Sequence, residues 1–215
     1  MGRGSSGIGR FGGGGGLNPA NVSNVEEMIS QRETNRSAVD QVLRVSQDMY
    51  DRYGAQTAEF QTADIKGKDA NTLAYYDGAN ITVNNAYFDP AQMDSAYDRS
   101  VSDGFHPGRG DKTGLEAVAA HEFGHLLTDR VATAMGLKSG LGNIDAAATK
   151  IVTEAKAATS HRGVVQMAAK ISRYATHSNA EAVAEAASDY WCNGNNAKAE
   201  SIAIMNVVNK YIGKK

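Results

Sequence analysis

The chain has 215 residues, of which 41% are hydrophobic, and this is enough apolar material for one compact domain of catalytic size. Its 22 basic and 24 acidic residues nearly balance, and no block of Lys or Arg appears, which argues against nucleic acid or an anionic membrane as a partner. Cys192 is the only cysteine, which excludes an internal disulfide and a multi-cysteine zinc cluster, so a metal site would have to use His, Asp and Glu.

The N-terminal stretch is rich in glycine. Nine of the 23 glycines lie within the first 16 residues, and such a segment buries too little apolar surface to offset the entropy of ordering it. We expect residues 1–17 to form a disordered tail or linker, either native or left by an expression vector, and residues 18–215 to form a single domain. No apolar run approaches the roughly 20 residues of a membrane span, and the N-terminus lacks the apolar segment of a signal peptide.

A helical pattern comes next, and strand patterns follow it. Residues 18–54 have apolar side chains at helical spacing, with Gly54 placed as the C-terminal stop. Residues 58–65, 72–76 and 79–84 have strand character, and the Asp77-Gly78 pair indicates a hairpin between the last two. We expect a small sheet on which the helix packs. Residues 79–84 are the candidate for an exposed edge strand that pairs with an extended peptide, and a paired interior strand is the alternative.

The remainder of the chain reads as helical. Pro90 begins a helix that ends near Gly104, and a loop over residues 103–114 leads to the next one. Thr113 and Glu116 match a capping box for a helix that reaches Met135. Further helical patterns cover residues 143–158, 164–174, 178–192 and 197–212. The predicted fold class is α+β, with a small N-terminal mixed sheet, a helical C-terminal lobe and a cleft between the two lobes.

The helix after Thr113 contains the motif His121-Glu122-Phe123-Gly124-His125. Positions i and i+4 of a helix lie on one face, so both imidazoles can bind one Zn²⁺ while Glu122 lies beside a water molecule. The alternative is a solvated helix in which the two histidines are incidental. Gly124 argues against that alternative, because glycine in a helix interior costs roughly 1 kcal/mol relative to alanine.

A catalytic zinc site needs a third protein ligand. The metzincin pattern is excluded, because Thr128 and Val131 stand where it requires Gly and His. Asp129 lies on the same helical row as His125, where it could only hydrogen-bond to a ligand from behind. The candidates for the third ligand are Asp129, His161, His177, Glu181, Glu185 and Asp189.

Glu181 and Glu185 are four residues apart in an alanine-rich helical segment. Small neighbours allow that helix to approach another backbone closely, and two carboxylates on one row repel unless a cation or an imidazole N–H compensates them. Two readings remain open. In one, Glu181 binds zinc and Glu185 lies behind it; in the other, Glu181 closes a capping box with Ser178 and Glu185 is solvated.

These segments resemble the active-site segments of the anthrax lethal factor metallopeptidase family. After HEFGH, a tyrosine, Tyr174, precedes an N-x-E-x-x-x-E helix at the interval found in that family, and residues 30–212 are similar to phage and prophage minor head or head-morphogenesis metallopeptidase domains. The chain is much smaller than lethal factor, so the substrate class of that protein does not carry over. The resemblance implies a zincin-like fold with His121, His125 and Glu181 as zinc ligands, Glu122 as general base, Tyr174 as a helper at the oxyanion or leaving group, and Glu185 as the hydrogen-bond partner of a ligand histidine.

Two functions are therefore expected as alternatives. The first is a phage- or prophage-encoded zinc metallopeptidase that hydrolyses a peptide or protein substrate. The second is a head-morphogenesis module that keeps the zinc site with little or no proteolysis and has phage capsid or portal proteins as partners. Both imply a cytoplasmic or virion-associated protein.

His106 and His177 are alternatives to Tyr174 in its role, although loop histidines are commonly solvent-exposed. Phe123 and Trp191 are expected in the core.

Overall fold

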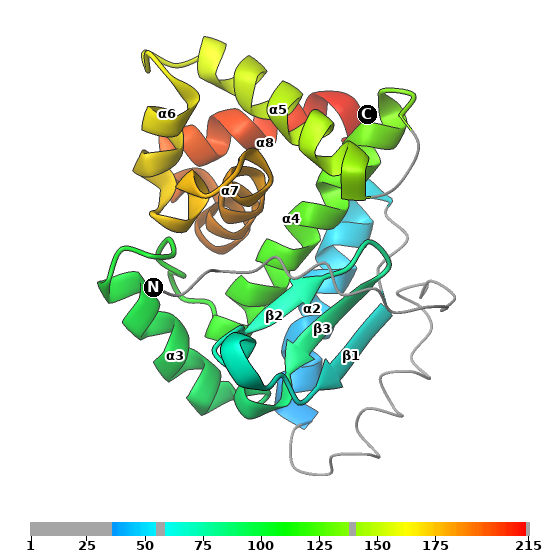
Figure 1. Ribbon diagram of the computed structural model, residues 1–215, viewed down its shortest axis with the longest axis vertical. Helices are drawn as coiled ribbons and strands as arrows, with labels where there is room; N and C mark the ends of the chain where they lie inside the picture. Colours follow the sequence, from blue (N-terminus) through cyan, green and yellow to red (C-terminus); the bar gives the residue numbers. More distant parts are fainter. Residues whose placement is uncertain (1–35, 55–58, 138–140, 214–215) are drawn as a thin grey trace.

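The computed structural model describes residues 36–54, 59–137 and 141–213, which form an α+β fold with a small mixed sheet (Figure 1). The expected coarse fold class is thus confirmed, while the predicted tail over residues 1–17 lies outside the described residues. The strands are β1 (Glu59–Ala63), β2 (Ala74–Tyr76) and β3 (Asn80–Asn84). The α-helices are α2 (Arg36–Tyr53), α3 (Pro90–Ser102), α4 (Gly114–Ala134), α5 (Leu141–Ala157), α6 (Val164–Ile171), α7 (Asn179–Asn193) and α8 (Ala199–Ile212). Short 3-10 turns are η1 (Gly67–Asp69), η2 (Asn85–Tyr87), η3 (Tyr174–Thr176) and η4 (Gly194–Asn196).

The sheet has the order β1-β3-β2, so the strand expected at the edge lies in the centre. β3 pairs antiparallel with β2 across the Asp77-Gly78 turn, as the hairpin pattern predicted, and parallel with β1 on its other side. The edge assignment for residues 79–84 was wrong because the hairpin pattern reveals one neighbour of a strand, whereas the parallel partner comes from a distant segment. The edge strand on the hairpin side is β2.

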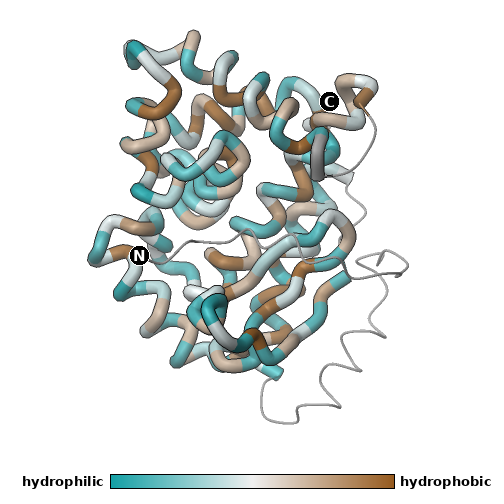
Figure 2. Tube along the Cα trace, viewed as in Figure 1, coloured by the Kyte–Doolittle hydropathy of each residue, from teal (hydrophilic) through white to brown (hydrophobic). Residues whose placement is uncertain are grey.

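α4 is the central helix of the fold. In Figure 1 it runs between the sheet and the group formed by α5, α7 and α8. The predicted capping box of Thr113 and Glu116 begins it, and Phe123, Leu127 and Val131 are fully buried along it. Brown, hydrophobic segments alternate with teal ones along the elements around it, as expected for amphipathic elements that share a core (Figure 2). No helix among the described residues is both long enough and apolar enough to cross a membrane.

α4 and α7 pack against each other very closely. A Cβ atom added at Gly124 would lie 2.6 Å from Ala184 Cα and 2.9 Å from Ala187 Cβ. The close packing of the two helices therefore explains why a glycine occupies position 124 in the interior of α4, since only a residue without a side chain fits there. The alanine-rich surface of α7 provides the other half of this close approach.

The helix predicted over residues 164–174 ends early. α6 stops at Ile171, and Ser172 adopts an extended conformation with φ −166° and ψ 169°. The Ser172 hydroxyl accepts a hydrogen bond from the Ala175 N–H and donates one to Glu185, which replaces the helical backbone pattern locally. The break places Tyr174 at the start of η3, close to α7, instead of at the end of a continuous helix.

Candidate metal centre

Three side chains from two helices converge on one buried point. His121 and His125 lie one turn apart on α4, and Glu181 lies in the first turn of α7. Glu181 Oε2 is 3.2 Å from His121 Nε2 and 3.6 Å from His125 Nε2, and one ligand atom from each of the three residues lies within 4.8 Å of the others. Among the residues that the structure describes, this is the group of three His, Cys, Asp or Glu side chains placed to hold a metal ion.

The side chain of Ser178 caps α7, but Glu181 does not close a capping box with it, because the Glu181 carboxylate lies against the two imidazoles. The backbone N–H of Glu181 donates to Ser178 Oγ at 3.1 Å. Burial alone would raise the pKa of the Glu181 carboxyl, but His125 and His121 outweigh that effect and hold the pKa well below its usual range.

Glu181 Oε2 provides a test of whether a metal ion fits. This oxygen is buried and makes no hydrogen bond within the described part of the chain. A buried carboxylate oxygen with no hydrogen bond is costly, unless a cation compensates it. Together with the Nε2 atoms of His121 and His125, it forms the two-histidine, one-glutamate donor set of catalytic zinc sites. The residues present therefore fit a zinc ion.

Glu185 lies behind His121 and fixes the orientation of its ring. Its Oε1 accepts a hydrogen bond from His121 Nδ1 at 2.8 Å, and its Oε2 accepts one from the Ser172 hydroxyl at 2.7 Å. With Nδ1 engaged, His121 directs Nε2 toward Glu181, which is the usual arrangement of a metal-binding histidine and its carboxylate partner. The alternative in which Glu185 is solvated is wrong, because Glu185 is 1% exposed.

Glu122 follows His121 on α4 and is 5% exposed. Burial raises the pKa of its carboxyl, against the opposing effect of His121 and His125 and of a hydrogen bond from the Tyr76 backbone N–H. A carboxylate whose pKa is raised toward neutrality is better suited to accept and return a proton. The contact with Tyr76 links this carboxylate to the edge strand β2.

Tyr174 lies beside His121, with ring centroids 5.7 Å apart and an interplanar angle of 24°. The segment that carries it is tied to the loop after α3, because the backbone N–H groups of Arg173 and Tyr174 donate to the carbonyl oxygens of Gly104 and Phe105. Burial, followed by the nearby carboxylates, raises the pKa of the Tyr174 phenol well above its usual value. The phenol therefore keeps its proton and remains a hydrogen-bond donor.

The other candidates for a third ligand have different positions. His161 pairs with Glu200 at 2.7 Å, and Asp189 accepts hydrogen bonds from Asn193 and from the Lys198 backbone N–H. Asp129 is buried on α4 but does not belong to the converging group, and the exposed His177 does not belong to it either. Phe123 is fully buried as expected, while Trp191 is only partly buried.

His106, expected only as an alternative to Tyr174, makes a contact with Glu185 that its sequence position did not reveal. It lies in the loop after α3, and its Nδ1 is 2.9 Å from Glu185 Oε1. The contact spans 79 positions of the chain, and neither helical nor strand periodicity marks a residue in a glycine-rich loop. The one available signal is a histidine inside a loop that leads directly into the HEFGH helix.

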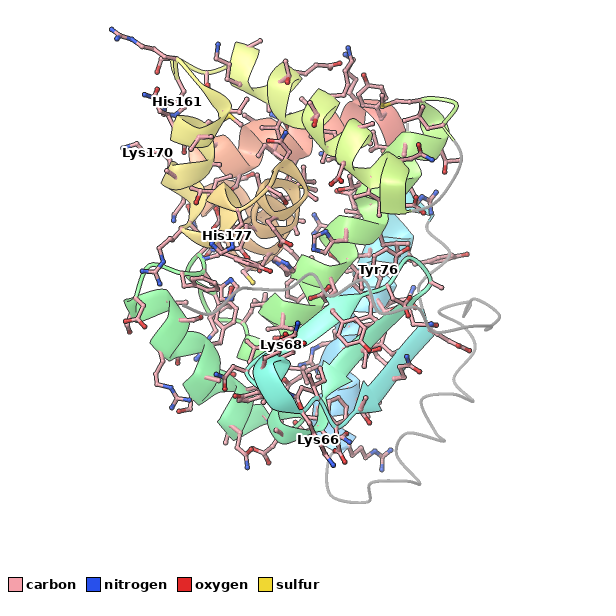
Figure 3. All side chains as sticks on the ribbon, viewed as in Figure 1. Lys66, Lys68, Tyr76, His161, Lys170 and His177 are labelled. Carbon is pink, nitrogen blue, oxygen red and sulfur yellow. The ribbon has the colours of Figure 1, made fainter. Side chains whose placement is uncertain are left out.

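A cavity of about 510 Å³ opens beside the converging side chains. One wall is formed by the η1 turn and β2, and the other by α4, the loop after α3, η3 and α7. Figure 3 shows Tyr76 and Lys68 on the sheet side and His177 on the helical side. Within the described residues β2 pairs only with β3, and all three residues of β2 line the cavity. The site thus combines a candidate metal centre, a buried carboxylate and a strand that lies at the edge of the sheet as far as the structure describes the chain.

Comparisons of this chain with protein-family models, with curated proteins and with solved structures found no match. The resemblance to the lethal factor family therefore stays a prediction. The donor set and the buried oxygen of Glu181 are the observations that bear on function.

Proposed function

We propose that the chain is a zinc-dependent metallopeptidase with a zincin-like fold, in which His121, His125 and Glu181 hold the metal ion. The observation that carries the proposal is the convergence of two imidazole nitrogens on a carboxylate oxygen that is buried and has no hydrogen bond to any residue the structure describes. Mixed nitrogen and oxygen donors favour zinc over magnesium or calcium, which prefer oxygen ligands alone.

A zinc ion in this position would supply Lewis acidity, which lowers the pKa of a water molecule and polarises a peptide carbonyl. Glu122 then accepts the proton of the attacking water and returns it to the amine that leaves. Tyr174 donates its phenolic hydrogen bond to the oxygen that becomes negatively charged when the carbonyl is attacked. Glu185 keeps His121 in the tautomer in which Nε2 is free.

The substrate class follows from β2. An extended peptide can add to an unpaired strand edge through main-chain hydrogen bonds, and the cavity beside β2 leads to Glu122. The peptide group nearest to the Tyr76 end of β2 would lie next to the general base. This arrangement favours hydrolysis within a peptide chain over hydrolysis of a small molecule.

The test compares wild type with Glu122→Gln. The purified wild-type chain should bind about one zinc ion and cleave members of an unbiased peptide library, with the products identified by mass spectrometry. Glu122→Gln keeps the size of the side chain and much of its hydrogen bonding but cannot take a proton, so zinc content and fold should survive while cleavage is lost. Wild type that binds zinc and cleaves nothing would favour the head-morphogenesis module, and equal cleavage by both proteins would refute the role of Glu122.

A further inference from the structure

His106 is held in one orientation by its neighbours. Its ring stacks on Tyr97 with centroids 5.4 Å apart and an interplanar angle of 8°, and it meets Phe105 and Tyr174 edge-on at 5.0 and 5.4 Å. Its Nδ1 is bound to Glu185, and its side chain is 14% exposed where it lines the cavity. The polar atom that the ring has left to offer is Nε2.

One carboxylate oxygen sets the tautomer of two imidazoles. Glu185 Oε1 lies 2.8 Å from His121 Nδ1 and 2.9 Å from His106 Nδ1. A carboxylate oxygen in contact with two ring nitrogens accepts a hydrogen bond from each, so in the neutral imidazoles both Nδ1 atoms donate and both Nε2 atoms are acceptors. His121 offers its Nε2 to the metal centre, and His106 has its own Nε2 left for the cavity.

We propose that His106 is a substrate-binding residue whose Nε2 accepts a hydrogen bond from a backbone N–H of the peptide in the cavity. This inference rests on the proposed peptidase function. The ring centroid of His106 lies 6.2 Å from that of His121, and an extended chain advances about 3.3 Å per residue. The contacted N–H group therefore belongs to a residue within about two positions of the bond that is cleaved. Because Glu185 and Tyr97 already hold the ring, binding costs little ordering entropy.

Two substitutions of His106 distinguish the role of Nδ1 from the role of Nε2. His106→Asn keeps an amide donor near the position of Nδ1, so Glu185 retains its partner, but places nothing near Nε2. His106→Gln reaches further and places an amide oxygen near the position of Nε2, where it can still accept. His161→Asn is the matched control, because His161 pairs with Glu200 and does not line the cavity.

The readouts are the zinc dissociation constant and, at saturating zinc, kcat and KM for a peptide that wild type cleaves. Binding of that peptide is also measured without turnover, in Glu122→Gln with and without His106→Asn. We expect His106→Asn to bind zinc within about twofold of wild type, while kcat/KM falls and the peptide dissociation constant rises by about 3- to 10-fold, the usual effect of one net hydrogen bond. His106→Gln should recover most of the peptide affinity, and His161→Asn should match wild type throughout.

Peptide affinity and kcat/KM at the wild-type level in His106→Asn would overturn the inference. A loss of activity that disappears when zinc is saturating would overturn it as well, since His106 would then serve only to support Glu185. If His106→Asn does not fold, wild-type peptide affinity in His106→Gln supports the inference, and a loss of affinity equal to that of His106→Phe contradicts it. A wild type that cleaves nothing refutes the peptidase proposal itself, and the inference about His106 falls with it.

Discussion

Replacing Gly124 with alanine measures how much the close approach of α4 and α7 matters. The new Cβ would lie 2.6 Å from Ala184 Cα, whereas carbon atoms in normal contact are about 3.5–4.0 Å apart. The two helices would have to separate by about 1 Å, because the nearest atom belongs to the backbone and cannot rotate away. Alanine gains about 1 kcal/mol in helix propensity, and overpacking costs about 1–3 kcal/mol. With the cost near its upper limit, the free energy of unfolding should fall by about 1–2 kcal/mol.

The same separation should weaken metal binding. His121 and His125 lie on α4 and Glu181 on α7, so helices that move apart draw the carboxylate away from the imidazoles. We expect the zinc dissociation constant of Gly124→Ala to rise by roughly 10-fold, comparable to the loss of a group that orients a ligand.

Urea unfolding of the metal-free protein, calorimetry and zinc titration check both expectations, and the midpoint temperature should fall by about 2–8 °C. Gly108→Ala is the matched control, because a Cβ at position 108 meets nothing within 4 Å. Its stability should stay within about 0.5 kcal/mol of wild type. A Gly124→Ala protein that is as stable as wild type and binds zinc equally well would refute the packing argument.

Three further predictions concern single side chains. Glu181→Ala should remove most zinc affinity, whereas Glu185→Ala should weaken it by roughly 10- to 100-fold, and the reverse order in a zinc titration would exchange their roles. Tyr174→Phe should retain zinc but lower kcat about 100- to 1,000-fold, as expected for one lost oxyanion donor, and an unchanged kcat would exclude that role. Burial raises the pKa of the Cys192 thiol to about 12, so at pH 8 the folded protein should react with iodoacetamide far more slowly than the urea-unfolded chain, and equal rates would show that the thiol is accessible.

The parts of the site that lie on one helix could be predicted from the sequence. The i and i+4 spacing places His121 and His125 on one face of α4, and this follows from helix geometry alone. The role of Glu181 was harder to predict, because its spacing from Ser178 fits a helix cap and its spacing from Glu185 fits a pair of carboxylates at a metal site. In the structure Ser178 caps the backbone N–H of Glu181, but the carboxylate turns to the histidines instead of closing a capping box.

The features that sequence reasoning missed depend on contacts between distant segments. The edge strand is β2 and not residues 79–84, because β1, which lies outside the hairpin, pairs with the other side of β3. His106 joins the site through a contact across 79 positions, and α6 ends early because Ser172 bonds to Glu185. Local periodicity carries no information about such pairings, so none of these three features could be read from spacing.

The position of the metal centre also has a consequence for folding. In the chain, α5 and α6 lie between His121 on α4 and Glu181 on α7. A cation held by α4 and α7 would close this segment into a loop, as a covalent cross-link does. In the chain-entropy model, closing a loop of about 60 residues raises the free energy of the unfolded state by about 4 kcal/mol. Ligands in both helices would thus make the final docking of α7 onto α4 depend on the ion, and the helices inside the loop would be the ones protected from proteolysis once it binds.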